Sequence, residues 1–210
     1  MTELTRRQRE RRLHRQQILE AAEEVFAREG FHAAGVQQIA EKAEFSVGYL
    51  YNLFESKEAL YVELIGLRAN EHLSEVEQRL DRAEGVLQKV RSVIEAKFDF
   101  FRRHRRFFDI FFTHLTTESR PRGPVFMPER CREAYECYLD RMRKVFEAGI
   151  RQGLFVDADP LTLVLCMEGM TRSIIAHWLY SGAEEGNESA PELVQQVLLE
   201  GILAEGAKDD

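Results

Sequence analysis

Polar and aromatic side chains crowd residues 46–57, which read SVGYLYNLFESK. At a helix start, the hydroxyl of Ser46 and the free backbone N–H groups suit a phosphate oxygen. Gly48 lacks a Cβ, so the backbone can approach a second molecule closely. Tyr51 combines a packing ring with an outward hydroxyl, and Lys57 adds positive charge at the next helix start. These residue types suit contact with a nucleic acid, although a Tyr at helical spacing is usually just packed and a lone Lys is usually a solvated surface charge.

The elements that position this stretch follow from residues 18–60. Apolar side chains recur at helical spacing at Ile18, Ala22, Val25 and Phe26. Gly30 is expected to end that first helix, Ser46 to cap a third helix and Ser56 to cap a fourth. Two short helices joined by a tight turn form a helix-turn-helix, whose second helix enters the DNA major groove.

Residues 18–60 resemble the DNA-binding domain of the TetR family of bacterial one-component transcriptional regulators, through their order of Gly, Ile-Ala, Ser, Tyr, Phe and Lys. The resemblance implies a homodimer that binds double-stranded operator DNA across an inverted repeat. It implies that Val47, Gly48 and Tyr49 face the bases, whereas Ser46, Tyr51 and Lys57 contact phosphates. The full set of expected DNA-binding residues is Gly35, Gln37, Ser46, Val47, Gly48, Tyr49, Tyr51, Asn52 and Lys57.

Three positions depart from that family's pattern. Gly35 stands where Thr or Ser is common, which leaves only its backbone N–H for a phosphate. Glu44 stands in the turn where Gly is usual, so the turn is either strained or shaped differently. Tyr49 stands where Thr is frequent, and its larger side chain should change which bases are read.

The charge of the chain is unevenly distributed. Residues 1–57 hold nine Lys and Arg against nine Asp and Glu, so the whole net charge of −7 lies in residues 58–210. A basic arm on a neutral head suits a protein that touches DNA at one end only. Six arginines form this arm in residues 6–15, after a possible capping box of Thr5 with Gln8. Two interpretations stay open, because the arm either follows the minor groove or is a solvated extension of the first helix.

The fold class is predicted to be all-α, because no run alternates like a strand. Residues 1–57 are expected to form a three-helix helix-turn-helix domain, in which residues 1–15 are the arm or helix extension. Residues 58–210 are expected to form a larger helical domain for effector binding and dimerisation. Its predicted helices are 58–81, 85–103, 105–117, 127–152, 160–181 and 191–204, with capping signals at Asp159-Pro160 and Ser189–Glu192. Residues 118–128 are expected to be a loop and 181–188 a polar linker.

Two sets of residues in the larger domain are candidates, one for effector binding and one for dimerisation. Residues 98–112, FDFFRRHRRFFDIFF, hold more phenylalanines than one helical face can bury, although such a stripe is often simple core. The expected effector-binding residues are Phe101, His104, Phe108, Phe111, Tyr138, Arg172 and Trp178.

The second set concerns dimerisation. Residues 161–179 are apolar on most sides, which favours an intersubunit four-helix bundle over a core helix of a monomer. The expected interface residues are Val164, Met167, Ile174, Ile175, Val194, Val197, Leu198 and Ile202. Glu168 and Arg172, four residues apart, are expected to pair with each other.

Other function classes find little support in the residues. No catalytic triad, paired-carboxylate or Gly-rich phosphate signature stands at a recognisable spacing, so neither an enzyme nor a cofactor is expected. The six histidines are scattered, and no metal site is expected. No apolar run approaches the roughly 20 residues of a membrane span, so a cytoplasmic protein without membrane partners is expected. Cys131, Cys137 and Cys166 lack CxxC spacing and are expected to be structural thiols.

The leading hypothesis is therefore a ligand-responsive repressor that binds a palindromic operator as a homodimer. A small apolar or amphipathic effector, which the sequence does not identify, would release it. A ligand-dependent activator is one alternative. The other is a small-molecule or redox-sensing binding protein with a weakened DNA-binding head.

Overall fold

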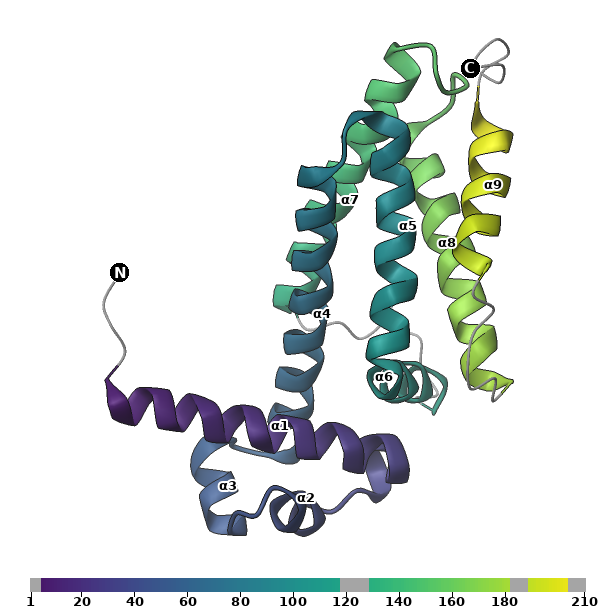
Figure 1. The fold of residues 1–210 in the computed structure, drawn as a ribbon. Helices are drawn as coiled ribbons and strands as arrows, with labels where there is room; N and C mark the ends of the chain where they lie inside the picture. Colours follow the sequence, from purple (N-terminus) through teal and green to yellow (C-terminus); the bar gives the residue numbers. More distant parts are fainter. Residues whose placement is uncertain (1–4, 118–128, 182–188, 204–210) are drawn as a thin grey trace. The chain divides into compact units, whose positions relative to one another are not determined.

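The computed structural model describes residues 5–117, 129–181 and 189–203, except for the side chains of residues 112–117 and 129–131. Within these residues the chain is helical, and its one isolated bridge pairs Phe155 with Leu203 (Figure 1). The prediction of an all-α fold is confirmed.

The helices follow the predicted order. They are α1 (Arg6–Ala33), α2 (Val36–Lys42), α3 (Val47–Leu53), α4 (Lys57–Arg82), α5 (Gly85–Arg103), α6 (Arg105–Thr117), α7 (Glu129–Arg151), α8 (Pro160–Tyr180) and α9 (Ala190–Ile202). The predicted helices of the larger domain agree with these bounds to within two residues. The predicted loop at 118–128 and the linker residues 182–188 lie outside the described residues.

Local capping explains most of these bounds. The Thr5 side chain accepts from the backbone N–H of Gln8, and the Gln8 side chain accepts from the N–H of Thr5, so the predicted capping box is confirmed. The carboxylate of Asp159 accepts from the N–H of Thr162 at 2.7 Å. The capping box predicted at Ser189 was wrong. Ser189 has helical backbone angles instead of the extended ones of an N-cap, and its side chain makes no capping hydrogen bond.

The described residues group into two compact units. The first unit holds α1, α2, α3, the start of α4 as far as Arg68, and α6 from Arg106. The second unit holds α4 from Ala69 together with α5, α7, α8 and α9. The boundary expected after residue 57 coincides with the start of α4, but α4 runs on into the second unit. The first unit also takes in α6, which sequence order had assigned to the larger domain.

In the first unit, α1 packs against α2 and α2 packs against α3 (Figure 1). Its core consists of fully buried apolar side chains, among them Ile18, Ala22, Phe26, Ile39, Leu50 and Leu60. Gly30 breaks the regular part of α1, as predicted, with φ of 77°, which a residue with a side chain rarely adopts. A buried ion pair joins Glu23 on α1 to Arg68 on α4 at 2.6 Å.

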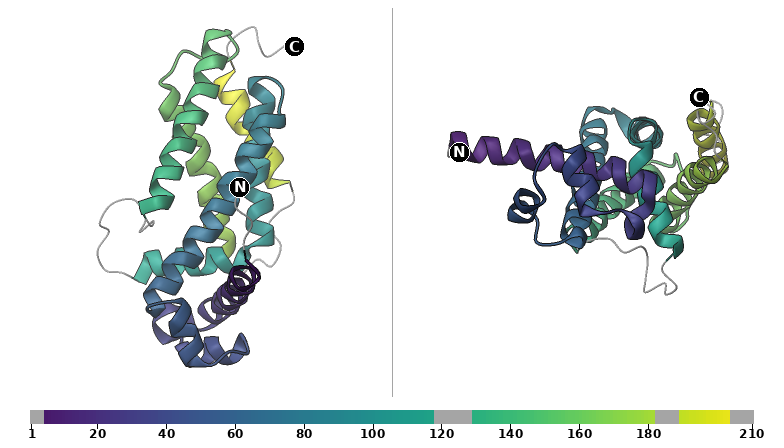
Figure 2. Two further views of the ribbon diagram at one scale, coloured as in Figure 1. Left: turned by 90° about the vertical axis from the view of Figure 1, so that its left-hand side faces the viewer. Right: turned by 90° about the horizontal axis from the view of Figure 1, so that it is seen from below.

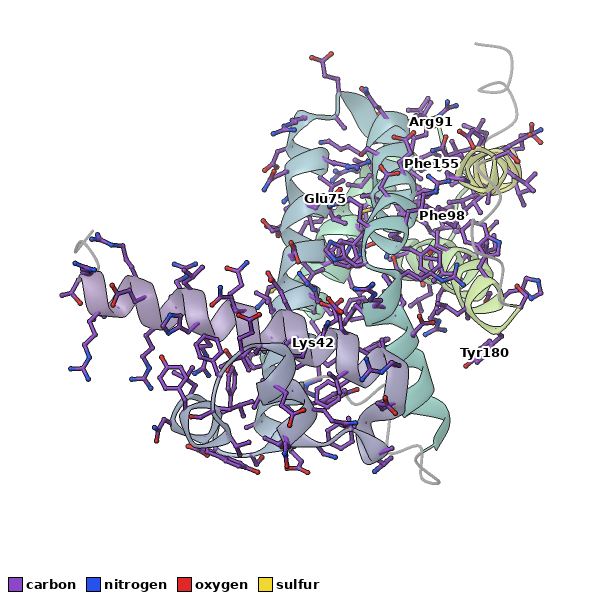
Figure 3. All side chains as sticks on the ribbon, turned by 60° about the horizontal axis from the view of Figure 1, so that its bottom comes forward. Lys42, Glu75, Arg91, Phe98, Phe155 and Tyr180 are labelled. Carbon is purple, nitrogen blue, oxygen red and sulfur yellow. The ribbon has the colours of Figure 1, made fainter. Side chains whose placement is uncertain are left out.

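In the second unit, α5 packs against α7, α8 and α9, and α8 lies between α7 and α9. Phe98 on α5, which Figure 3 labels, is fully buried and lies 5.4 Å from the ring of Trp178. The N–H of Val156 donates to the carbonyl of Ile202 at 2.7 Å, which ties the α7–α8 connection to the end of α9. Among the helices described, none combines the length and apolar character of a membrane span.

Candidate functional site

The turn between α2 and α3 closes α2 with a Schellman motif. The N–H of Phe45 donates to the carbonyl of Ala40 at 2.9 Å, and the N–H of Glu44 donates to that of Glu41 at 3.1 Å. This motif requires left-handed backbone angles at Glu44, whose φ is 60°. The turn therefore keeps the geometry that Gly usually supplies, at a cost of about 1–2 kcal/mol for a residue with a side chain.

Helix α3 presents one exposed face. Ser46 caps it by accepting from the N–H of Tyr49 at 3.1 Å, as predicted. The exposed face carries four of the expected DNA-binding residues, namely Val47, Gly48, Tyr51 and Asn52. Tyr51 is 50% exposed and Val47 is 36% exposed, whereas Leu50 on the opposite side is fully buried. The structure thus brings these residues together on the surface of the first unit.

Tyr49 lies to the side of that face. Its hydroxyl is 2.8 Å from Nδ1 of His14 on α1, and its ring stacks on Phe45 at 5.2 Å. At about 100° per residue, position 49 is turned by about 200° from position 47. The predicted base contact would therefore require Tyr49 to leave His14. In this structure Tyr49 connects α3 to α1.

The two expected residues at the start of α2 already hydrogen-bond within α2. The N–H of Gly35 donates to Oε1 of Gln38 at 2.8 Å, so the one group that Gly35 could offer a phosphate has an intramolecular acceptor. Gln37 is exposed, and its amide donates to Glu41 at 3.0 Å. The exposed side chain of Gln37 can give up this bond for a contact with DNA more easily than the capping N–H of Gly35 can.

Lys57 is held inside the first unit by the end of α1. Its ammonium donates to the carbonyl oxygens of Phe31, His32 and Ala34 at 2.8, 3.3 and 3.0 Å. It also lies 4.8 Å from the centre of the Phe31 ring. An ammonium has three N–H donors, and all three are used here. The expected phosphate contact would cost at least one of these bonds.

Two residues that sequence reasoning missed also hold α3. His14 contacts Tyr49, and Arg15 donates to the carbonyl of Leu53 at 2.6 Å, forms an ion pair with Glu63 and lies 4.3 Å from the Phe54 ring centre. Their signal was present in the sequence. Extending the buried stripe of α1 back from Ile18 by one turn reaches both residues.

The expected effector-binding residues fall into separate clusters. Phe101 and Trp178 contact each other at 5.7 Å, and both are buried. Phe108 and Phe111 lie in the first unit, where both contact Phe107. His104 ends α5 with its ring 4.3 Å from Phe100, while Arg172 is exposed on α8.

A polar cluster within the second unit was missed by the sequence analysis. The ammonium of Lys97 bridges both oxygens of Glu168 at 2.8 and 2.9 Å, and the Tyr138 hydroxyl donates to Glu168 at 2.6 Å. Glu168 thus bonds to α5 and α7, and the expected pair with Arg172 was wrong. Burial raises the pKa of the Tyr135 and Tyr138 phenols, and the negative charge of Glu168 adds to the effect.

His72 on α4 is the second missed polar group. Its Nδ1 is shielded from solvent and has no hydrogen-bond partner among the described residues, and its ring lies 4.7 Å from the Phe100 ring. Burial is the main cause that lowers the pKa of His72 to about 3, and the positive charges of Lys97, Arg103 and His104 contribute to the same shift. The imidazole is therefore neutral at physiological pH.

Six of the eight residues expected at a dimer interface lie in the core of the chain. They are Val164, Met167, Ile175, Val194, Leu198 and Ile202, none of them more than 7% exposed. Val197 is 53% exposed and Ile174 is partly exposed. The physical reason is that α8 is apolar on most sides, so its periodicity does not show which side faces the core of its own chain.

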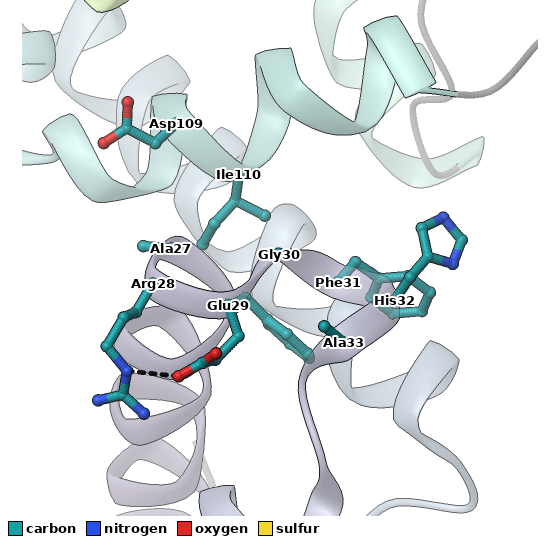
Figure 4. A pocket seen from close by; sticks show the side chains of 10 residues that line it. Ala27, Arg28, Glu29, Gly30, Phe31, His32, Ala33, Asp109 and Ile110 are labelled. Atoms are coloured by element: carbon teal, nitrogen blue, oxygen red, sulfur yellow. Dashed lines mark hydrogen bonds and ion pairs between the residues drawn. The ribbon is translucent and has the colours of Figure 1, made fainter. Parts of the chain in front are cut away.

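An open hollow of about 450 Å³ lies in the first unit, where the end of α1 meets α6 (Figure 4). Its apolar lining includes Phe26, Gly30 and Ile110, and an ion pair between Arg28 and Glu29 lies on its side. No expected effector-binding residue lines this hollow.

The described part of the chain holds no group of side chains arranged to bind a metal ion. No three His, Cys, Asp or Glu side chains there lie close enough to hold a metal ion. Cys137 and Cys166 are free and exposed instead of buried, so the expectation of structural thiols was wrong for these two. The Cys131 side chain lies outside the described residues.

Comparison with known proteins identifies the fold and the helix-turn-helix. Residues 18–64 match the family described as bacterial regulatory proteins, tetR family. The activator FasR of Mycolicibacterium smegmatis is 36% identical over 57% of this chain, and the repressor NicS of Pseudomonas putida is 31% identical over 68% of it. The chain belongs to the TetR family.

Other comparisons bear on the whole length of this TetR-family chain. The alignments span 56% of FasR and 66% of NicS, so less than two thirds of either relative is matched. The similarity in fold to solved structures covers more of the chain than these sequence alignments do. FadR of Bacillus halodurans has a TM-score of 0.73 at 21% identity and covers 89% of this chain and 98% of its own. FadR of Bacillus subtilis, solved in complex with stearoyl-CoA, has a TM-score of 0.72 at 20% identity, with the same coverage.

The interactions of Lys57 predict a structural role within the TetR-family head. Lys57→Met should lower the free energy of unfolding by about 1–3 kcal/mol, because carbonyls at the end of α1 lose a charged donor. The salt dependence of DNA affinity should stay unchanged, because no phosphate contact is removed. Thermal denaturation and fluorescence anisotropy titrations at several salt concentrations measure the two effects. A variant of native stability whose salt slope falls by about 0.9 for each Lys57 bound to the duplex would instead make Lys57 a phosphate ligand.

The lowered pKa of His72 predicts an acid-dependent loss of stability. An unfolded histidine has a pKa near 6.5, so protons favour the unfolded chain as the pH falls from about 6.5 to about 3. Stability present above pH 6.5 is therefore lost across that window. His72→Gln should weaken this pH dependence, as thermal melts at stepped pH would measure. The exposed His177→Gln is the control, and equal pH profiles of wild type and His72→Gln would contradict the prediction.

Proposed function

We propose that this chain is a ligand-responsive transcriptional repressor that binds a palindromic operator as a homodimer. The observation that carries the proposal is the exposed face of α3, held rigidly by a capped turn inside the family match at residues 18–64. In a helix-turn-helix this is the helix that enters the major groove.

The chemistry of that face supports contact with bases and backbone. The amide of Asn52 suits the paired donor and acceptor of adenine, and the methyl groups of Val47 suit the thymine methyl. Gly48 is exposed, and a methyl group placed there would meet no atom within 4 Å. Nothing in the described part of the chain therefore demands glycine at this position, and close approach to a duplex supplies a reason for it. Ser46 and Tyr51 complete the set with hydroxyl groups for phosphates.

The exposed side of α8 and α9 is the proposed dimer surface, in place of the side predicted from sequence. Large apolar side chains are 40–65% exposed there, at Leu161, Leu165, Tyr180, Leu193 and Val197. Figure 3 shows Tyr180 projecting from the end of α8. Gly169 on α8 and Gly201 on α9 have open space where a side chain would stand, which permits close helix packing. A self-complementary apolar face of this kind fits a twofold pair of identical chains.

The effector is proposed to bind in the second unit. The aromatic pair of Phe101 and Trp178 supplies apolar surface, and the polar cluster around Glu168 supplies hydrogen-bonding groups. The stearoyl-CoA complex of a protein with a similar fold makes acyl compounds the first class to test. Release from DNA requires that the effector bind more tightly to the conformation that does not fit the operator, because equal affinity shifts nothing.

A ligand-dependent activator is the second candidate, since the relative aligned at 36% identity is an activator. Both candidates need the same operator complex. They differ in whether a promoter carrying the operator becomes less active or more active when the protein is present, which a reporter assay decides.

Selection of bound duplexes from a random library at physiological salt tests the proposal. The expected result is enrichment of an inverted repeat whose half-sites are about one helical turn or more apart. Addition of stearoyl-CoA, and separately of free stearate, should then lower the affinity if the repressor assignment is correct. A folded protein that enriches no motif would overturn the proposal.

The dimer surface predicts the effect of a charge on α8. Leu165→Glu should give monomers, because a carboxylate would be buried between the two copies. Operator affinity should fall about a hundredfold or more, since half-sites would then be bound singly. Sedimentation measures the first effect and anisotropy titration the second. Leu67→Glu, at an exposed leucine of α4, should leave both unchanged. A dimeric Leu165→Glu protein would place the interface elsewhere.

A further inference from the structure

The first three turns of α1 form a feature that the family match does not contain. The match begins at Ile18, whereas α1 begins at Arg6. Residues 5–17 hold six arginines and one glutamate, which gives this arm a formal charge of +5. The rest of the head, residues 18–57, carries more acids than bases. The arm is therefore the main source of positive charge near α3.

The arm is a regular helix. Its start is fixed by the capping box of Thr5 and Gln8, and residues 5–13 are all exposed. Figures 1 and 2 show it extending beyond α2 and α3 within the first unit. An exposed helix of this composition buries little apolar surface, so packing within the chain does not account for it.

Three contacts hold the arm beside α3. A guanidinium N–H of Arg11 donates to the carbonyl of Asn52 at 3.4 Å, His14 bonds to Tyr49, and Arg15 donates to the carbonyl of Leu53. Arg11, His14 and Arg15 lie along one side of α1. The end of α3 and the base of the arm therefore form one rigid piece, and Asn52 lies on the exposed face of α3.

The arginines of the arm are not equivalent. Arg7 lies one turn before Arg11, about 6 Å along the helix and on the same side, and Arg12 flanks this side. Arg6 forms an ion pair with Glu10 at 2.8 Å. Arg7 and Arg12 form no ion pair with any residue that the structure describes. Arg7, Arg11 and Arg12 form a basic stripe that continues the DNA-facing surface past the end of α3.

We propose that this basic stripe binds the phosphate backbone of the DNA flanking each half-site, which extends the contact beyond the helix-turn-helix. The inference rests on the proposed function, since it assumes that the exposed face of α3 meets DNA. It also decides between the two interpretations of the arm. An α-helix with its side chains is about 10–12 Å wide, whereas the minor groove of B-DNA is about 6 Å wide, so a helical arm cannot lie in that groove. Phosphates on its rim are accessible to it.

The test removes charge from the arm and preserves its helix. Arg7→Gln with Arg12→Gln keeps good helix formers at both positions and leaves the contacts to α3 intact. A dimer of this variant should lose up to about four phosphate contacts, each reducing the slope of log affinity against log salt by about 0.9. The matched control is Arg82→Gln with Arg151→Gln, two exposed arginines of the second unit, and it should keep the wild-type slope.

Two duplexes identify where the contact lies. On the selected operator with long flanks, the variant should bind more weakly than wild type, whereas on an operator trimmed to its half-sites the two should bind equally. Equal slopes for wild type and variant on the long duplex would overturn the inference, and so would a loss that the control reproduces. If the loss of affinity depends on the A·T or G·C content of the flanks, the arm reads the minor groove, and the inference of backbone contact is wrong. Because wild type serves as the reference, its failure to select any operator would instead defeat the proposed function.

Discussion

The head depends on a single constraint, which is that its two short helices cannot be stable alone. Helices α2 and α3 have seven residues each, and isolated helices of this length do not form in water. Helix α1 packs against α2, and its residues His14 and Arg15 hold α3 through contacts to Tyr49 and Leu53. The geometry of the exposed face of α3 is therefore determined by α1, through burial at its centre and polar contacts at its edges.

Those polar contacts share one physical theme, which is that cations satisfy the carbonyl groups at the ends of helices. Lys57 donates to carbonyls at the end of α1, and Arg15 donates to a carbonyl at the end of α3. Both positive charges lie at the negative end of a helix dipole, where they are favourable. The consequence is that these cations of the head act internally. Positive charge for an external partner must come from residues that the core does not use, and the arm has them.

Much of this architecture was predictable because its signals are local. Helix bounds followed from spacing and from Asp159-Pro160, and the break within α1 followed from Gly30, all of which act within a few residues. The stripe of α1 indicates the side on which His14 lies, but it does not pair His14 with Tyr49, which is 35 residues away. The partners of Lys57 were not predictable for the same reason, because they lie 23–26 residues away in sequence. For a related reason, the sequence did not show which side of α8 is exposed. Residues 161–179 are apolar on most sides, and only the position of α5, α7 and α9 decides which of them are buried.

The exposed thiol of Cys166 has a practical consequence. It lies on the outward side of α8, next to Leu165, whereas Cys137, the second exposed thiol among the side chains that the structure describes, lies on α7. If two copies pair through this side of α8, association protects one thiol from alkylating reagents and leaves the other reactive. The unmodified protein thus contains a chemical reporter of its own assembly together with an internal standard. The ratio of labelling at the two cysteines follows association at any concentration, with or without DNA, and needs no substitution.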